Sequence, residues 1–384
     1  MKIGFFTDTY LPVLDGVVVS IESARKTLEA MGHEVFVFAP QVKGYKDKNK
    51  NVFRFKSIKY IKEPEYRYAL GMFPVDKKIR DLINLKMDIA HAHSPLSLGI
   101  LAKFISEKQK IPLVYTHHTH YEEYIKAYFK EKIVLPYLAK EYTRWFCNRS
   151  DLVIAPSKKF KTILEKYGVK KRVKIDILPT GIDLEKFNKK ESRATIENIK
   201  KKYKISKDKK IVLTVGRINK EKNIEFLLKA WQHVVKKRDD VELVVVGEGK
   251  RLKEMKKKYS NANFVGAIPH NEMPAIYDTA DLFAFASLAE TQGLVILESM
   301  ASGLPVVVLK DEAFSGVVKN NINGFAVESK SVVKFAEKLN QILDDKRLFK
   351  KFSENALLTA DNFSEKEIAN KLLKIYQGLI NSKK

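Results

Sequence analysis

The stretch "DLFAFASLAETQGLVILESMASGLPVVVL", residues 281–309, contains a complete strand–helix–strand pattern. Its ends, "DLFAFAS" and "PVVVL", are continuous apolar runs of the kind found in parallel strands covered on both faces. Between them, "LVILESMAS" has the apolar spacing of a helix, which Gly303 and Pro305 bring to an end. This order predicts a right-handed crossover within a parallel sheet.

The same alternation runs through the rest of the chain. Further strands are expected at 2–7, 34–39, 87–92, 112–117, 151–156 and 173–178, and then at 210–216, 241–247 and 263–267. So many strands are unusual for one sheet, and we therefore predict two doubly wound α/β domains. The polar, Lys-rich stretch at 183–194 marks the boundary, which gives an N-terminal domain at 1–187 and a C-terminal domain at 188–363. A final amphipathic helix at 364–384 is able to pack on either domain, or to cross back to the first.

Composition restricts the class of protein. The chain has 384 residues, of which 45% are apolar and 30% charged, as is typical of a folded globular protein. The net charge of +25 is spread along it, since the first 187 residues hold 34 basic and 21 acidic side chains and the rest hold 37 and 25. Nucleic acid, an anionic membrane surface and phosphorylated ligands all stay open as partners.

Cysteine content and hydropathy indicate the compartment. The lone Cys147 excludes an internal disulfide framework and fits a reducing environment. No apolar run approaches the roughly 20 residues needed to cross a bilayer, and no signal region precedes "KIGFF". We therefore expect a cytoplasmic protein.

Two acids in the opening stretch have the spacing of a ligand site. Glu290 and Glu298 are separated by seven residues, with Gly293 between them. The loop amides at Gly293 and Leu294 are unpaired donors at a helix N-terminus, which favour an anion. Glu298 lies about two turns along and could accept hydrogen bonds from ribose hydroxyls. Taken alone, the spacing favours a structural pair of acids, and it is the strand–loop–helix context with Gly293 that favours a ligand site.

The pattern E-x7-E followed by "MASGLPVVV" resembles the retaining GT-B glycosyltransferases of family 4. These enzymes transfer a sugar from a nucleotide-sugar, and their two Rossmann-like domains face each other across a cleft. The resemblance covers nearly the whole chain, because other segments match in order: "DTYLPVLDGVVVSI" (8–21), "LPTGID" (178–183), "VGRINKEKN" (215–223), "GEG" (247–249) and "VGAIPHNEMPAIYDTADLFAFAS" (265–287).

The resemblance implies a donor site. Its expected members are Gly16, Arg217, Lys222, Ile268, Gly293, Leu294 and Glu298, with Glu290 as a catalytic residue that holds the transferred sugar. Cleavage of the sugar–diphosphate bond leaves negative charge, which Arg217 can meet with a forked contact and Lys222 with a point charge. The alternative for these two cations is a solvated pair at a strand end. We find no Asp-x-Asp and no His, Cys or Asp cluster with metal-ligand spacing, so no metal or cofactor is expected.

The segment "YTHHTHYEEY" (115–124) follows a first-domain strand. The resemblance aligns the catalytic His of the family with His118. A neutral imidazole at that place can orient the transferred sugar or an acceptor hydroxyl, because it both donates and accepts hydrogen bonds. His93, in "HAHSPLSLG", and Tyr121 are expected on the acceptor side. The remaining histidines of these segments are expected in packing or surface roles. Family 4 enzymes retain anomeric configuration, and front-side attack is the implied route, with the departing phosphate taking the acceptor proton.

The acceptor is indicated by "TQG" and "HTHYEEY", which resemble the branch that glucosylates diacylglycerol. The expected donor is UDP-glucose, although the sugar and the nucleotide base are not separable by pattern. Segments 60–86 and 124–149 combine basic and aromatic residues and suit an anionic bilayer, which would place the enzyme at the inner face of the cell membrane. A solvated core helix is the alternative for each segment.

Other functions stay open. A family 4 enzyme could use a soluble glycan or a polyprenyl-linked acceptor. A basic polyanion-binding protein would explain the charge, but no nucleic-acid module is recognised and no nucleic acid is expected as a partner. A nucleotide-sugar 2-epimerase shares the two-domain fold, but its usual acid–base set is not evident. We expect a monomer or a homodimer.

Overall fold

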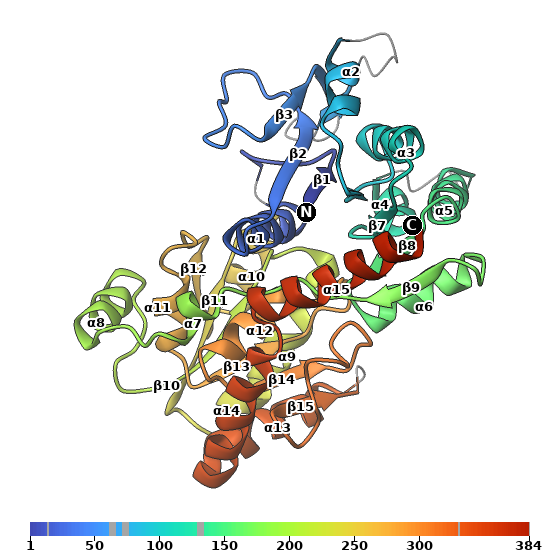
Figure 1. Ribbon diagram of the computed structural model, residues 1–384. Coiled ribbons are helices and arrows are strands. Elements are labelled where there is room, and N and C mark those ends of the chain that lie inside the picture. The colour runs from blue at the N-terminus through green and yellow to red at the C-terminus, as the bar shows by residue number, and fades with distance from the viewer. Residues whose placement is uncertain (14, 61–66, 71–76, 129–133, 329–330, 384) are drawn as a thin grey trace. The chain divides into compact units, whose positions relative to one another are not determined.

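The computed structural model describes residues 1–13, 15–60, 67–70, 77–128, 134–328 and 331–383 (Figure 1). They form two compact units, one of Met1–Gly181 with Glu365–Lys384 and the other of Ile182–Ser364. The boundary falls at Gly181 rather than at Phe187, because Ile182 and Phe187 are both buried in the core of the second unit. The backbone N–H of Ile182 also donates to the carbonyl of Phe363 in that unit, at 2.9 Å.

The first unit is built on a seven-stranded parallel sheet in the order β3-β2-β1-β6-β7-β8-β9. Its strands are β1 (Lys2–Phe6), β2 (Glu34–Pro40), β3 (Val52–Phe55), β6 (Ile89–Ala92), β7 (Leu113–Thr116), β8 (Leu152–Ala155) and β9 (Lys174–Ile177). β4 (Ser57–Lys59) and β5 (Arg67–Ala69) form a separate antiparallel pair. The helices are α1 (Gly16–Ala30), α2 (Lys77–Asn84), α3 (Ser97–Gln109), α4 (Tyr121–Tyr128), α5 (Val134–Cys147), α6 (Lys158–Lys166) and α15 (Glu365–Lys383).

The second unit has a six-stranded parallel sheet in the order β12-β11-β10-β13-β14-β15. Its strands are β10 (Lys210–Val215), β11 (Val241–Val246), β12 (Asn263–Gly266), β13 (Leu282–Phe285), β14 (Val306–Leu309) and β15 (Gly324–Val327). Its helices are α7 (Leu184–Asn188), α8 (Arg193–Lys202), the 3₁₀ turn η1 (Lys220–Lys222), α9 (Ile224–Val235), α10 (Leu252–Lys258), α11 (Met273–Asp278), α12 (Leu294–Ala301), α13 (Val332–Asp344) and α14 (Lys346–Asp361).

Each sheet is covered on both faces, which confirms the predicted doubly wound architecture. In β10, Val212 packs into one cluster with Trp231 of α9, while the next residue, Leu213, packs into the opposite cluster with Ile296 of α12. The alternation follows from the two-residue period of a strand.

The C-terminal helix α15 belongs to the first unit and packs on α1 (Figure 1). Leu372 and Tyr376 of this helix are buried in the same cluster as Phe5 of β1 and Val18 of α1. α15 therefore covers one face of the first sheet together with α1.

In each sheet the order of strands reverses at one place. The chain moves outward from β1 to β3 and then returns to β6 beside β1, and it does the same from β10 to β12 before returning to β13. In open α/β sheets, ligands bind outside the carboxyl ends of the strands at such a switch point. The topology therefore predicts ligand binding at the loops after β1 and β6 in the first sheet and after β10 and β13 in the second.

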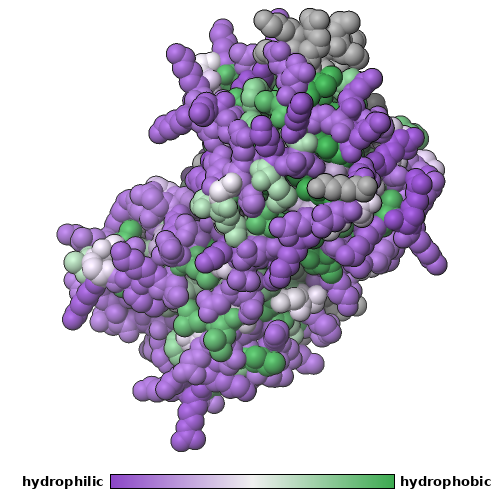
Figure 2. Space-filling model, viewed as in Figure 1, coloured by the Kyte–Doolittle hydropathy of each residue, from purple (hydrophilic) through white to green (hydrophobic). Residues whose placement is uncertain are grey.

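The surface agrees with the high charge of the chain. The face drawn in Figure 2 is covered mainly by hydrophilic side chains, with smaller apolar areas between them. Among the helices of the described ranges, none has the length and apolar character needed to cross a membrane.

Candidate functional site

The switch point of the second sheet joins two predicted site residues. Lys222 ends η1 after β10, and Glu290 lies in the loop after β13. Lys222 Nζ lies 2.5 Å from Glu290 Oε1, and the two side chains are only 18% and 13% exposed. Asn223, whose φ of 52° starts α9 in a left-handed conformation, donates from Nδ2 to the Ala286 carbonyl at 3.2 Å. The two loops are thus tied together by an ion pair and a hydrogen bond.

Arg217 lies at the same edge but is far more accessible. Its side chain is 73% exposed, and its guanidinium is 3.9 Å from Glu221, a weak contact one turn away. Such a pair contributes little, so the guanidinium can turn to a ligand at small cost. Ile268, after β12, packs on the core of the unit and remains partly accessible.

The "GEG" segment has a structural reason for its first glycine. Gly247 follows β11 with a φ of 136°, and a Cβ there would lie 2.0 Å from the carbonyl oxygen of Gly216. The neighbouring N–H of Ile218 donates to the Glu248 carbonyl at 2.8 Å. The loops after β10 and β11 therefore pack backbone to backbone, which places Arg217 on a rigid support.

Gly293 begins α12 in a left-handed conformation, with a φ of 75°, and a Cβ there would lie 2.8 Å from Cε1 of Phe314. No side chain of the described residues caps this helix start, so the first-turn amides, beginning at Leu294, are not used by a cap. Amides of this kind are suited to an anion.

Glu298, on the second turn of α12, is partly buried. Its Oε2 accepts a hydrogen bond of 2.8 Å from the hydroxyl of Tyr277, which lies on α11. Burial raises the pKa of the carboxyl, while the hydrogen bond from Tyr277 and the charge of Lys186 act in the opposite direction.

At the switch point of the first sheet, Asp8 follows β1 and is buried. Its carboxylate accepts hydrogen bonds from the hydroxyls of Ser94 and Ser97 and from the N–H of Leu98 at 3.2 Å. Burial raises the pKa of this carboxyl despite the three donors. Asp8 thus links the end of β1 to the start of α3.

His118, after β7, is in contact with His93, after β6. His93 Nδ1 lies 3.0 Å from His118 Nε2, and the rings stack with centroids 5.3 Å apart. His91 also stacks on His93, with ring centroids 4.2 Å apart, and is held by the Tyr376 hydroxyl at 2.6 Å and Thr116 Oγ1 at 2.7 Å. Burial lowers the pKa of His118 to about 4 and that of His91 to about 3, so both rings are neutral near pH 7.

The protonation of the pair follows from one unpaired atom. His93 Nε2 is buried without a hydrogen-bond partner in the described part of the chain. Buried N–H groups are rarely left unpaired, whereas a lone pair is tolerated more often. We therefore assign the His93 proton to Nδ1, which donates to His118 Nε2. His118 then carries its own proton on Nδ1.

Gly16 and Tyr121 complete the predicted set in this unit. Gly16 starts α1, where Asp15 accepts from the N–H of Val18 at 2.9 Å, and the position of a Cβ on Gly16 is open space. Tyr121 starts α4, and burial raises the pKa of its hydroxyl. Across the described ranges, no three His, Cys, Asp or Glu side chains gather as a metal-ligand group.

Both halves of the chain match known protein families. Residues 14–186 match Glycosyltransferase Family 4, and residues 195–359 match Glycosyl transferases group 1. The alpha-monoglucosyldiacylglycerol synthase of Streptococcus pneumoniae is 35% identical over 334 residues, which cover 84% of this chain and 74% of that protein. The synthase of the same name from Acholeplasma laidlawii is 30% identical over 408 residues, which cover 100% of this chain and 99% of that protein. The chain belongs to glycosyltransferase family 4.

The solved structures agree on the fold. The HepE protein of Anabaena, crystallised in complex with UDP, superposes with a TM-score of 0.78 at 18% identity, covering 99% of this chain and all of that one. The same protein in complex with UDP-glucose gives a TM-score of 0.75. The chain therefore has the GT-B fold. Its membership of family 4 makes it a retaining enzyme of the hexosyl-transferring class.

Family 4 motifs account for the loops at both switch points, but several contacts are not visible in the sequence. Asp8 is a single acid after a strand, and its position at the switch point is its only signal. Tyr277 lies inside the matched segment 265–287, where the sequence does not distinguish it from the neighbouring apolar residues. Asn223 closes "VGRINKEKN", and its tie to Ala286 depends on the order of the strands.

Proposed function

We propose that this glycosyltransferase transfers glucose from UDP-glucose to the free hydroxyl of 1,2-diacylglycerol. The observation that carries the proposal is the identity of 35% and 30% to two alpha-monoglucosyldiacylglycerol synthases, over most or all of the chain. The UDP-glucose complex of HepE supports the donor, although that protein is similar in fold only.

Each predicted donor residue of the second unit has a proposed role that suits its surroundings. Arg217 is exposed and binds the diphosphate, together with Lys222 and the amides at the start of α12. Glu290, beside Lys222, holds the sugar. Two further contacts are proposed. Ile268 contacts the nucleotide base, and Glu298 contacts the ribose.

The transfer step is a front-side substitution. The bond from C1 of glucose to the β-phosphate oxygen breaks, the bond from C1 to the acceptor oxygen forms on the same face, and the acceptor proton passes to the departing phosphate. UDP and the glucolipid are the products. Fixed cations and amides stabilise charge on the leaving group without reorganisation, so we expect transfer to continue in the presence of a chelator. Neutral His118 orients a hydroxyl of the sugar through its Nδ1 proton.

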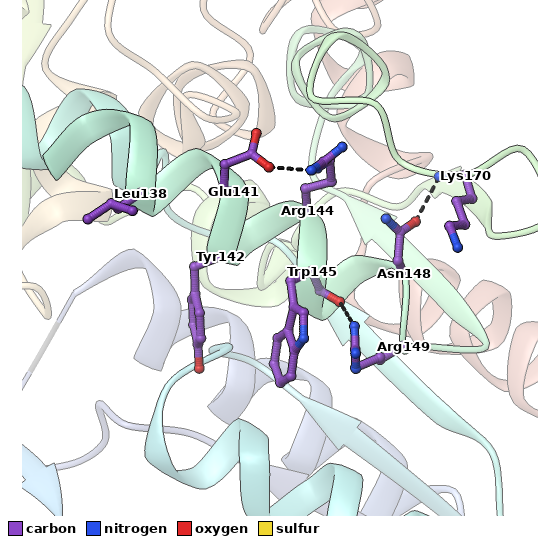
Figure 3. Close-up of a pocket in the computed structure, with 8 residues that line it drawn as sticks. All are labelled: Leu138, Glu141, Tyr142, Arg144, Trp145, Asn148, Arg149 and Lys170. Carbon is purple, nitrogen blue, oxygen red and sulfur yellow. Dashed lines mark hydrogen bonds and ion pairs between the residues drawn. The ribbon is translucent and has the colours of Figure 1, made fainter. Parts of the chain in front are cut away.

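A surface on α5 supports docking to a lipid bilayer (Figure 3). Tyr142 and Trp145 lie parallel with centroids 5.5 Å apart, and the Arg149 guanidinium lies 4.3 Å from the indole centre. They line a hollow of about 700 Å³ together with Leu138 and Lys170. Apolar side chains that insert between lipids, flanked by cations that contact phosphates, are typical of interfacial helices.

The same helix exposes further apolar side chains before the hollow: Val134 is 64% exposed and Tyr137 58%. Residues 61–66, 71–76 and 129–133 of the two segments predicted to contact the membrane lie outside the described residues. α5 is therefore the part of these segments on which the proposal rests. Docking there would hold the enzyme at the inner face of the cell membrane, where diacylglycerol is presented.

Two measurements test the assignment. Calorimetric titration should show UDP binding more tightly than GDP, and Glu298→Ala should weaken UDP; unchanged binding in that variant contradicts the donor site. In sedimentation assays, binding of the protein to vesicles should require anionic lipid and should decrease with added salt.

For the membrane surface, Leu138→Glu should reduce vesicle binding, whereas Leu358→Glu should not. Leu358 is a matched control because it is an exposed leucine on α14 of the second unit, at 63% against 53% for Leu138. Equal binding by the two variants would remove α5 from the proposal.

A further inference from the structure

Tyr277 is the only described residue that hydrogen-bonds the Glu298 carboxylate. The Tyr277 side chain is fully buried, with its ring 5.8 Å from Phe187 and 6.1 Å from Phe283. Its hydroxyl reaches Glu298 Oε2 at 2.8 Å, and the only other acceptor nearby in the described ranges, the Val295 carbonyl, is at the longer distance of 3.4 Å. The tyrosine hydroxyl is thus committed to the carboxylate.

The geometry leaves the two carboxylate oxygens in different situations. Oε2 is fixed by Tyr277, whereas Oε1 accepts no hydrogen bond from any residue that the structure describes. A carboxylate held at one oxygen loses less rotational freedom when the other binds a ligand, and it presents that oxygen in a fixed direction. Glu298 therefore has one supported and one available acceptor.

We propose that Tyr277 is a positioning residue for donor binding, which fixes Glu298 so that Oε1 accepts hydrogen bonds from the ribose hydroxyls of the nucleotide. The inference rests on the proposed function, because it takes Glu298 as a donor-binding group. Tyr277 itself does not touch the nucleotide and acts through the carboxylate.

The charge state of Glu298 gives this role a measurable consequence. The groups that face the carboxyl are Tyr277 on α11 and Lys186 on α7, and Lys186 in turn faces Asp183 and His270. Burial raises the pKa of Glu298, and both Tyr277 and Lys186 lower it again. Without the hydroxyl, the carboxyl is protonated at a higher pH and then loses acceptor capacity. As the pH is lowered, a variant without the Tyr277 hydroxyl should therefore lose donor binding at a higher pH than the wild type does.

The test is UDP affinity as a function of pH for the wild type and Tyr277→Phe, which keeps the ring and its contacts with Phe187 and Phe283. We expect affinity about tenfold weaker near neutral pH and an acid limb moved to higher pH. In transfer assays, the KM for the nucleotide-sugar should rise while kcat at saturating donor stays nearly constant. Thermal melts report whether the variant is folded.

Tyr203→Phe is the matched control, because the Tyr203 hydroxyl donates to Glu272 Oε2 at the same 2.8 Å in the same unit. This variant should bind UDP like the wild type. In a Glu298→Ala background, which has neither a carboxylate to position nor a group to titrate there, Tyr277→Phe should change the affinity little further and shift no acid limb.

The outcomes separate the inference from the proposed function. If Glu298→Ala binds UDP normally, the donor assignment is wrong. If Glu298→Ala weakens UDP but Tyr277→Phe matches Tyr203→Phe in affinity and pH profile, the positioning role is overturned. If Tyr277→Phe weakens UDP by the same factor in the wild-type and Glu298→Ala backgrounds, Tyr277 acts through general packing and the inference also fails.

Discussion

Lys222 and Glu290 form an ion pair of 2.5 Å at the switch point of the second sheet, although 67 residues of chain, including three strands, separate them. The pair neutralises two partly buried charges before any ligand arrives. A diphosphate bound at the start of α12 would compete with Glu290 for the Lys222 ammonium. The carboxylate that is released is then free to accept hydroxyls of the sugar.

Removing either member of the pair should abolish most transfer. We expect Lys222→Ala and Glu290→Ala each to lower kcat by about 10²–10³-fold, because charge that develops on the leaving group or sugar loses a fixed partner. Circular dichroism should show both variants folded. Lys310→Ala is the control, since Lys310 forms an ion pair of 2.8 Å with Glu328 that is exposed to solvent. Activity close to the wild type in Glu290→Ala would refute the role of Glu290.

Gly293 should not tolerate a side chain. Alanine there meets both a φ of 75° and the ring of Phe314 at 2.8 Å, so Gly293→Ala should lower the free energy of unfolding by about 1–3 kcal/mol and weaken UDP binding. Denaturant titration measures the first effect and calorimetry the second. Gly378→Ala, on the open surface of α15, should be neutral or stabilising by up to about 1 kcal/mol. Equal stability of the two variants would contradict the account of Gly293.

His118 should matter for transfer and His120 should not. The His118 ring is held by His93 and carries its proton on Nδ1, whereas His120 Nε2 bonds the Tyr167 hydroxyl at 3.0 Å on the side of α6. We expect His118→Ala to reduce kcat/KM by about tenfold to a hundredfold and His93→Phe to produce part of that loss. Unchanged steady-state kinetics in His118→Ala would assign sugar orientation to another residue.

Buried neutral histidines should make the protein sensitive to acid. Burial lowers the pKa of His117 from 6.5 to about 3, so the folded state binds fewer protons than the unfolded state below pH 6.5. The stability is complete above pH 6.5 and decreases as the pH falls towards 3, by about 1.4 kcal/mol per pH unit for this group. Denaturant titrations across this range should show a shallower pH dependence for His117→Phe than for the wild type. Identical slopes would contradict a neutral His117.

The fold was largely predictable because parallel strands buried on both faces are continuous apolar runs, as in "VELVVVG". The strands β3, β4, β5 and β15 lack this signal. β3 carries Arg54 and is mostly half-exposed, β4 and β5 have three residues each, and β15 begins at Gly324. The break predicted at 183–194 contains α7 and the start of α8, because the apolar side chains of Ile182 and Phe187 enter the second core.

The site was predictable where it depends on strand ends, and not where it depends on the direction of a side chain. Motif order places Lys222 and Glu290 after neighbouring strands, but it does not show their ion pair or the left-handed turn at Asn223 that follows Lys222. The contact of Tyr277 with Glu298 depends on how α11 packs against α12, and the His93–His118 pair depends on the rotation of two rings. Neither has a signature in residue spacing.

The most direct test of the central claim is the transfer of labelled glucose from UDP-glucose to 1,2-diacylglycerol in anionic vesicles, with a chelator present. The account predicts a labelled monoglucosyldiacylglycerol with the α configuration of the donor retained, and loss of this product in Glu290→Ala. No lipid product, with label transferred instead to a soluble glycan or a polyprenyl-linked acceptor, would contradict the proposed acceptor.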